Sequence, residues 1–128
     1  MTIGERGVVL VTGGCGYVGS IVVPELLALG EQVRIVDNMW FRTPPPAHPN
    51  LELVEGDLRR LDPAWLDGVR GVIHLAGLSN DPTADFAPHL NAEVNVQAAR
   101  RLAETTALRA RAEGREIRDQ PVLTHVQQ

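Results

Sequence analysis

The feature that most constrains this chain is a glycine-rich stretch near its start, Gly7 to Ser20, with the sequence GVVLVTGGCGYVGS. It begins with a short apolar run rich in β-branched residues, which is typical of a buried strand in a parallel sheet. Gly13, Gly16 and Gly19 then follow in a regular series. Glycines in this arrangement permit a tight turn from strand to helix, close approach of the backbone to a pyrophosphate, and close packing of the helix on the strand. The stretch therefore predicts a dinucleotide site at the start of a helix.

An acidic residue strengthens this prediction. Asp37 follows a second apolar run, Gln32 to Val36, roughly 20 residues after the glycines. A carboxylate there accepts hydrogen bonds from both ribose hydroxyls of adenosine and repels a 2′-phosphate, which favours NAD over NADP. Arg42, close by in sequence, keeps NADP open. Two simpler interpretations also stay open: the glycines merely join a strand to a helix, and Asp37 with Asn38 forms an ordinary turn.

Apolar runs alternate with turn formers along the rest of the chain, which predicts an α/β fold with a parallel sheet and helices on both faces. The expected further strands are Leu51 to Val54, Gly71 to Gly77 and, less clearly, Pro121 to Val126. The expected helices are Tyr17 to Leu29, Pro63 to about Asp67, and Pro88 to Glu113. The sheet-facing positions of the first and last helices are expected to be Ile21, Val22, Leu26 and Leu29, and Leu90, Val94, Ala98 and Leu102. The prolines between Met39 and Asn50 predict an exposed loop of polyproline II character.

Composition narrows the classes of function. A length of 128 residues predicts one domain at most, and a net charge of −4 without a basic block argues against nucleic-acid or anionic-membrane partners. With no signal-peptide pattern and no membrane-spanning apolar run, we expect a soluble cytoplasmic protein. The single cysteine, Cys15, excludes a disulfide framework and a cysteine-based zinc site, and no metal site is expected. His74, within an apolar run, is expected to be a hydrogen-bonded core residue.

Several motifs occur in order between Val8 and Glu104. They are Thr12-Gly13-x-x-Gly16-x-x-Gly19, Asp37-Asn38, Gly56-Asp57-Leu58, His74-Leu75-Ala76-Gly77, Leu78-Ser79-Asn80-Asp81-Pro82, and Asn95. Together they resemble the extended short-chain dehydrogenase/reductases, and most closely the branch of NAD-dependent nucleotide-sugar epimerases and dehydratases. The resemblance implies a Rossmann-type sheet in the strand order 3-2-1-4, with a fifth strand beside the fourth if one forms.

The resemblance also implies a role for each matching residue. The pyrophosphate would be held by the glycine loop, the adenosine ribose by Asp37 and Asn38, and the adenine by Asp57 and Leu58. The full set of implied NAD-binding residues is Gly13, Gly16, Tyr17, Val18, Gly19, Asp37, Asn38, Asp57, Leu58, Ala76, Gly77 and Asn95. Ala76 and Gly77 would line the nicotinamide ribose, and Asn95 would help to fix the active-site end of the neighbouring helix and its water. Ser79 and Asn80 would face the substrate.

The chain departs from that family at the catalytic pair. In the family a Tyr-x-x-x-Lys pair follows a fifth strand: the tyrosine exchanges a proton with a sugar hydroxyl while hydride moves to or from the nicotinamide, and the lysine lowers the tyrosine pKa. This sequence contains no lysine, and its basic side chains are arginines and histidines. Its one tyrosine, Tyr17, lies in the glycine loop. No catalytic residue is therefore assigned.

We expect residues 1–114 to form an NAD-binding Rossmann domain that is truncated relative to the family. Residues 115–128 are expected to form a divergent tail that could contain a short strand, and the substrate domain is expected to be absent. Three functions stay open. The chain is an NAD-binding, epimerase/dehydratase-like domain that does not catalyse alone; or it is a half-enzyme completed by another copy or a complementing chain along the open sheet edge; or it is a non-catalytic dinucleotide-sensing module.

Overall fold

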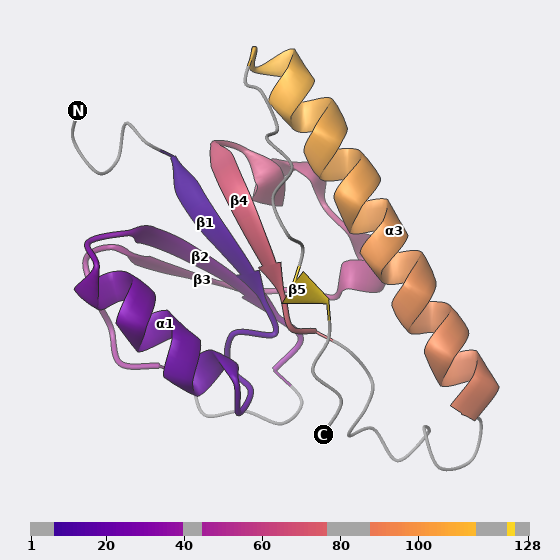
Figure 1. Cartoon of the computed structure of the whole chain (residues 1–128), viewed down its shortest axis with the longest axis horizontal. Helices are drawn as coiled ribbons and strands as arrows, with labels where there is room; N and C mark the ends of the chain where they lie inside the picture. The colour runs from indigo at the N-terminus through magenta and orange to yellow at the C-terminus, as the bar shows by residue number, and fades with distance from the viewer. Residues whose placement is uncertain (1–6, 40–44, 77–87, 115–122, 125–128) are drawn as a thin grey trace.

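The computed structural model describes residues 7–39, 45–76, 88–114 and 123–124, and the side chains of all of these except 88–95 and 123–124. Its strands form one parallel sheet in the order β3-β2-β1-β4-β5 (Figure 1). The strands are β1 (Val8–Thr12), β2 (Gln32–Asp37), β3 (Leu51–Glu55), β4 (Val69–His74) and β5 (Leu123–Thr124). The predicted Rossmann-type order 3-2-1-4 is confirmed, and the short β5 lies beside β4.

Helices cover both faces of the sheet. Helix α1 (Gly19–Ala28) lies on one face, and α3 (Pro88–Ala112) lies on the other with the 3-10 helices η2 (Leu58–Arg60) and η3 (Pro63–Leu66) (Figure 1). Because successive residues of a strand point to opposite faces, β1 contributes to both cores. The buried core on the α1 side consists of Val9, Val11, Cys15, Val23, Val33, Ile35 and Met39. The core on the α3 side consists of Leu10, Val36, Leu66, Val69 and Leu102.

The rotation of α1 differs from the predicted one. Gly19 and Val23 are buried, whereas Ile21 is 54% exposed and Leu29 is 74% exposed, so the prediction that these last two face the sheet is wrong. The reason is the contact between Gly19 and Gly14: a Cβ on Gly19 would lie 2.6 Å from the Gly14 Cα. This backbone contact orients the helix, and the residue one turn later, Val23, follows it into the core. The spacing of apolar residues in the helix does not reveal this contact, so it could not predict which side of α1 faces the sheet.

The boundaries of β4 also differ from the predicted ones. β4 begins at Val69, the partner of Val8, and an extra residue in β4, Arg70, lies between this pair and the next pair, Val9 with Gly71. It ends at His74, the partner of Thr12, because β1 ends there. By contrast, the predicted starts of β2 and β3 are confirmed, and each strand extends one residue further than expected. The proline-rich segment is described from Pro45 on, and residues 45–50 contain neither helix nor strand.

Glycines with a left-handed backbone end three elements at or near the predicted places: Gly30 (φ 82°) after α1, Gly68 (φ 72°) after η3 and Gly114 (φ 70°) after α3. This conformation costs glycine little and other residues more, which is why helices often end on it. On α3, Leu102 is buried and Ala98 is half-buried, as predicted. The side chains of Leu90 and Val94 lie outside the described residues.

Helix α3 is also bound to the connection between β3 and β4 by polar side chains. Arg101 donates to the Arg59 carbonyl at 3.0 Å, and Arg109 donates to the Pro63 carbonyl at 3.2 Å. At the end of α3, the Glu113 carboxylate accepts a hydrogen bond from the Gly68 N–H at 3.2 Å. These bonds satisfy backbone groups of the connection that lie outside the sheet's hydrogen-bond ladder. They place residues 57–68 against α3.

Candidate functional site

The turn between β1 and α1 leaves no room for a side chain at Gly13, Gly14 or Gly19. Gly13 has a left-handed backbone, φ 70°, and a Cβ there would lie 2.8 Å from the Cα of Ala76 at the end of β4. A Cβ on Gly19 would lie 2.5 Å from the Gly14 carbonyl carbon. Gly16 is less crowded, with its Cβ position 3.3 Å from the Gly13 oxygen. The turn is therefore packed against its own helix and against the end of β4.

The N-terminus of α1 offers free backbone donors. The Gly13 N–H donates to the Val36 carbonyl at 2.8 Å, and the Ser20 N–H donates to the Gly16 carbonyl at 2.9 Å. Within the described parts of the chain, the N–H groups of Tyr17, Val18 and Gly19 donate to no acceptor. The first turn of α1 carries no acidic side chain, so nothing there offsets the positive end of the helix dipole. Such an end is suited to binding an anion.

The Asp37 carboxylate joins the end of β2 to the glycine turn. It is 9% exposed, and its Oδ2 accepts the Cys15 N–H at 2.9 Å. Its Oδ1 accepts the Met39 N–H at 2.7 Å, and Met39 has a φ of 69°, which is unusual for a residue with a side chain. The sequence predicts that Asp37 binds a ribose, and it does not indicate these two bonds. They hold a negative charge in a fixed place between β1 and β2.

Thr12 joins the ends of β1 and β4. Its fully buried hydroxyl lies 2.6 Å from His74 Nδ1 and accepts the N–H groups of Leu75 at 3.1 Å and Ala76 at 3.3 Å. This short contact holds the imidazole ring of His74 against the end of β1. The core role predicted for His74 is confirmed.

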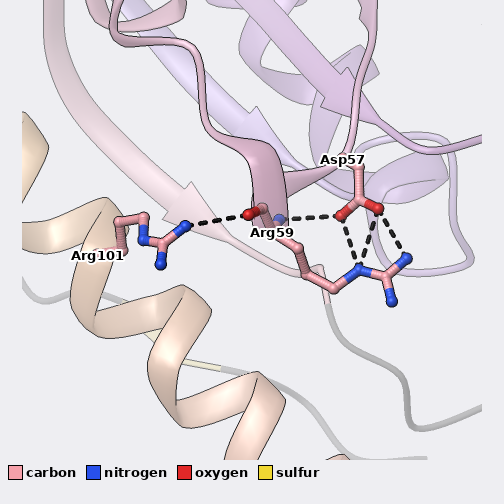
Figure 2. A network of polar contacts seen from close by, with 3 residues as sticks. All are labelled: Asp57, Arg59 and Arg101. Atoms are coloured by element: carbon pink, nitrogen blue, oxygen red, sulfur yellow. Dashed lines mark hydrogen bonds and ion pairs between the residues drawn. The ribbon is translucent and has the colours of Figure 1, made fainter.

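Asp57 lies beyond the end of β3 and caps η2 (Figure 2). Its Oδ1 accepts the Arg59 backbone N–H at 2.9 Å, and the Arg59 guanidinium bonds both oxygens, with Nη2 2.7 Å from Oδ2. These side-chain hydrogen bonds lower the pKa of Asp57 below its ordinary value of 3.8, although partial burial acts in the opposite direction. Arg101 of α3 binds the Arg59 carbonyl from the other side (Figure 2). Arg59 is not among the site residues predicted from the sequence; its place two residues after a helix-capping aspartate is the signal that could have identified it.

Parallel strands bring their carboxyl ends to one edge of a sheet, and that is where the implied cofactor residues in described positions gather. They are Gly13, Gly16, Tyr17, Val18 and Gly19 after β1, Asp37 and Asn38 at the end of β2, Asp57 and Leu58 after β3, and Ala76 after β4. Asn95 lies on α3, but its side chain is outside the described residues. Gly77, Ser79 and Asn80 also lie outside them.

The described residues contain neither a candidate metal site nor a candidate membrane-spanning helix. Among residues 7–39, 45–76 and the described side chains of α3, no group of three or more histidine, cysteine, aspartate or glutamate residues is placed to hold a metal ion. No helix in the described part of the chain is long and apolar enough to cross a membrane.

Comparison with known proteins decides the family. Residues 9–115 match the model of the NAD-dependent epimerase/dehydratase family. The chain belongs to this family. The resemblance inferred from the motifs is therefore confirmed.

Individual relatives act on different substrates. A 3β-hydroxysteroid dehydrogenase/Δ5→4-isomerase of Mycobacterium tuberculosis is 44% identical over 58% of this chain and 20% of its own. A UDP-glucose 4-epimerase of Corynebacterium glutamicum is 39% identical over 55% of this chain and 22% of its own. The solved structure of MoeE5 in complex with UDP-glucuronic acid and NAD superposes with a TM-score of 0.68 and 33% identity, covering 81% of this chain and 34% of that one. The chain thus spans about a fifth of the length of the curated relatives it matches.

Proposed function

We propose that this chain binds NAD at the carboxyl ends of its strands and forms the cofactor-binding part of an epimerase/dehydratase-like protein. The observation that carries the proposal is the combination of a glycine turn too crowded for side chains with a fixed, nearly buried carboxylate beside it. In the proposal the turn and the N-terminus of α1 hold the pyrophosphate, and Asp37 with Asn38 holds the adenosine ribose. Ala76 and Gly77 line the nicotinamide ribose.

The residues present fit this cofactor. The free N–H groups of Tyr17, Val18 and Gly19 are donors suited to phosphate oxygens. Each Asp37 oxygen already accepts one backbone N–H and keeps a further lone pair for a ribose hydroxyl. The same charge would repel a 2′-phosphate, which favours NAD over NADP. Bound NAD would supply a hydride acceptor at its nicotinamide ring.

We further propose that these 128 residues do not catalyse turnover by themselves. General acid–base chemistry needs a positioned group of suitable pKa. The sequence contains no lysine, and its one tyrosine is in the glycine turn and 71% exposed. The substrate class proposed for the whole protein is a nucleotide sugar, supported by the epimerase and MoeE5 matches; a hydroxysteroid is the alternative raised by the mycobacterial match. The proposed location of the protein is the cytoplasm.

A half-enzyme completed by another chain is the second candidate. In the described part of the sheet β5 is an edge strand paired with β4 alone, on the side where the family's further strands would add. An unpaired edge can accept a strand from a second copy or a complementing chain. A non-catalytic sensing module is the third candidate, and it differs from the first only in whether NAD binding changes association with a partner.

The test is isothermal titration of the chain with NAD and with NADP. Saturable NAD binding, at least about tenfold tighter than NADP binding, supports the proposal, because a tenfold difference corresponds to one lost charge-assisted contact. The matched variant is Asp37→Asn, which keeps the shape and removes the charge, so its preference for NAD should shrink. Absence of NAD binding would overturn the proposal. Turnover of UDP-glucose or of a 3β-hydroxysteroid by the purified monomer, sized by light scattering, would overturn its non-catalytic part, and turnover by a dimer alone would favour the half-enzyme.

A further inference from the structure

The segment that carries Asp57 is held from several sides. The Gly56 N–H donates to the Asp37 carbonyl at 2.9 Å, which places the segment directly beside the end of β2. A Cβ on Gly56 would lie 2.5 Å from the Trp65 ring, so the backbone packs directly on that ring. From α3, Arg101 donates to the Arg59 carbonyl at 3.0 Å. The backbone on both sides of Asp57 is therefore fixed at the edge of the sheet where the dinucleotide site is proposed.

The Asp57 side chain is held as well, by Arg59 (Figure 2). Arg59 Nε lies between the two oxygens, 3.1 Å from Oδ1 and 3.0 Å from Oδ2, and Nη2 lies 2.7 Å from Oδ2. The Asp57 side chain is still 32% exposed, so a ligand can reach it. A carboxylate with two oxygens has about four acceptor positions, and Arg59 with its backbone N–H uses most of them. An ionised carboxylate accepts only, so what remains is suited to a single N–H donor.

We propose that Arg59 is a positioning residue for the adenine end of the site: its guanidinium holds the Asp57 carboxylate in the orientation that accepts the 6-amino group of adenine. This inference rests on the proposed binding of NAD. It assigns a specificity role to a residue outside the expected set of cofactor contacts. The same contact lowers the pKa of Asp57, chiefly through the side-chain hydrogen bonds from Arg59, against the opposing effect of partial burial.

The proposal predicts discrimination between two dinucleotides. In nicotinamide hypoxanthine dinucleotide an oxo group replaces the 6-amino group, so a fixed carboxylate meets an acceptor in place of a donor. The wild-type chain should bind NAD more tightly than this analogue. The Arg59→Ala variant should lose about fivefold in NAD affinity, as expected for a partly exposed charged contact, and should change less than about twofold towards the analogue. The Arg59→Lys variant keeps the positive charge but lacks the two-pronged donor geometry of the guanidinium, so its affinity for NAD should lie between those of the wild-type chain and Arg59→Ala.

Two further variants separate positioning from general structural support. Arg60→Ala removes an exposed charge from the same 3-10 helix, and no described hydrogen bond joins its side chain to Asp57. Its NAD affinity should stay within about twofold of wild type. In the Asp57→Asn background the Arg59→Ala change should cost almost nothing more, because Arg59 acts through Asp57. In the ligand-free chain, NMR titration of the Asp57 carboxyl carbon should show a higher pKa in Arg59→Ala than in wild type.

Each outcome has one meaning. Equal losses of both dinucleotides in Arg59→Ala, or full additivity in the double variant, would overturn the positioning role while leaving NAD binding intact. An unchanged preference in Arg59→Ala would do the same. If the wild-type chain binds neither dinucleotide, the proposed function fails and this inference fails with it. Thermal unfolding of every variant, followed by circular dichroism, confirms that the chains compared are folded.

Discussion

Replacing Asp37 by alanine tests the central feature of the site without any ligand. The change removes the acceptor of two backbone N–H groups, at 2.9 Å and 2.7 Å, from a position that is 9% exposed. A hydrogen bond to a charged group contributes about 1.5–3 kcal/mol, and relief of the burial cost of the carboxylate offsets part of the total. We expect the free energy of unfolding to fall by about 3 kcal/mol. For a chain of this size the melting temperature should fall by about 10 °C.

The assay is urea unfolding followed by circular dichroism, with free energies extrapolated to water. The Asp37→Asn variant keeps one acceptor oxygen and turns an amide group towards the other N–H, so we expect it to lose about 2 kcal/mol. Glu55→Ala is the matched control, since Glu55 is the exposed partner of Asp37 in the register of β2 with β3. Its stability should change by less than about 0.5 kcal/mol.

If Asp37→Ala loses no more stability than Glu55→Ala, the two bonds made by the Asp37 carboxylate do not hold the glycine turn. Asp37 would then be a ligand residue alone. A change in the slope of the unfolding free energy against urea concentration, rather than in the midpoint, would indicate that the variant alters the compactness of the unfolded or folded state.

Three other changes probe the site. Gly19→Ala places a methyl group 2.6 Å from the Gly14 Cα, so it should lower the free energy of unfolding by about 2 kcal/mol and the affinity for NAD by more than about tenfold. The control is Gly71→Ala, which has open space at its Cβ and should leave the affinity for NAD unchanged in isothermal titration. Thr12→Val should cost about 2 kcal/mol in urea unfolding because it leaves a buried histidine nitrogen without its hydroxyl partner, and a loss below about 0.5 kcal/mol would contradict the assigned network. The pKa of Asp57 is lower in the folded chain than its unfolded value of 3.8, so this contact adds stability above pH 3.8 that is lost as the pH falls through the folded pKa. Arg59→Ala should therefore show a weaker decline in the free energy of unfolding with acid below pH 3.8. An identical pH profile in the two chains would refute the contact.

Much of the fold was predictable because its signals are local. The apolar runs, the glycines after β1 and the helix end at Gly114 each depend on neighbouring residues, and the strand order followed from the family resemblance. The orientation of α1 was not predictable from its apolar positions. Ile21 and Val23 are similar in hydrophobicity, and the contact between two glycine backbones decides which of them is buried.

The sequence by itself determined the class of site: where the chain turns sharply, where a carboxylate follows a strand, and that no lysine is present to serve a tyrosine. Those properties depend on residue type and on spacing within a few residues, and a single chain contains both. Only the tertiary structure decided what each carboxylate does. Asp37 binds the N–H of Cys15 from another strand end, and Asp57 is held by an arginine whose backbone is bound from α3. The bonds from Cys15 to Asp37 and from Arg101 to Arg59 join residues far apart in the chain. The first of them exists because parallel strands bring their carboxyl ends to one edge of the sheet.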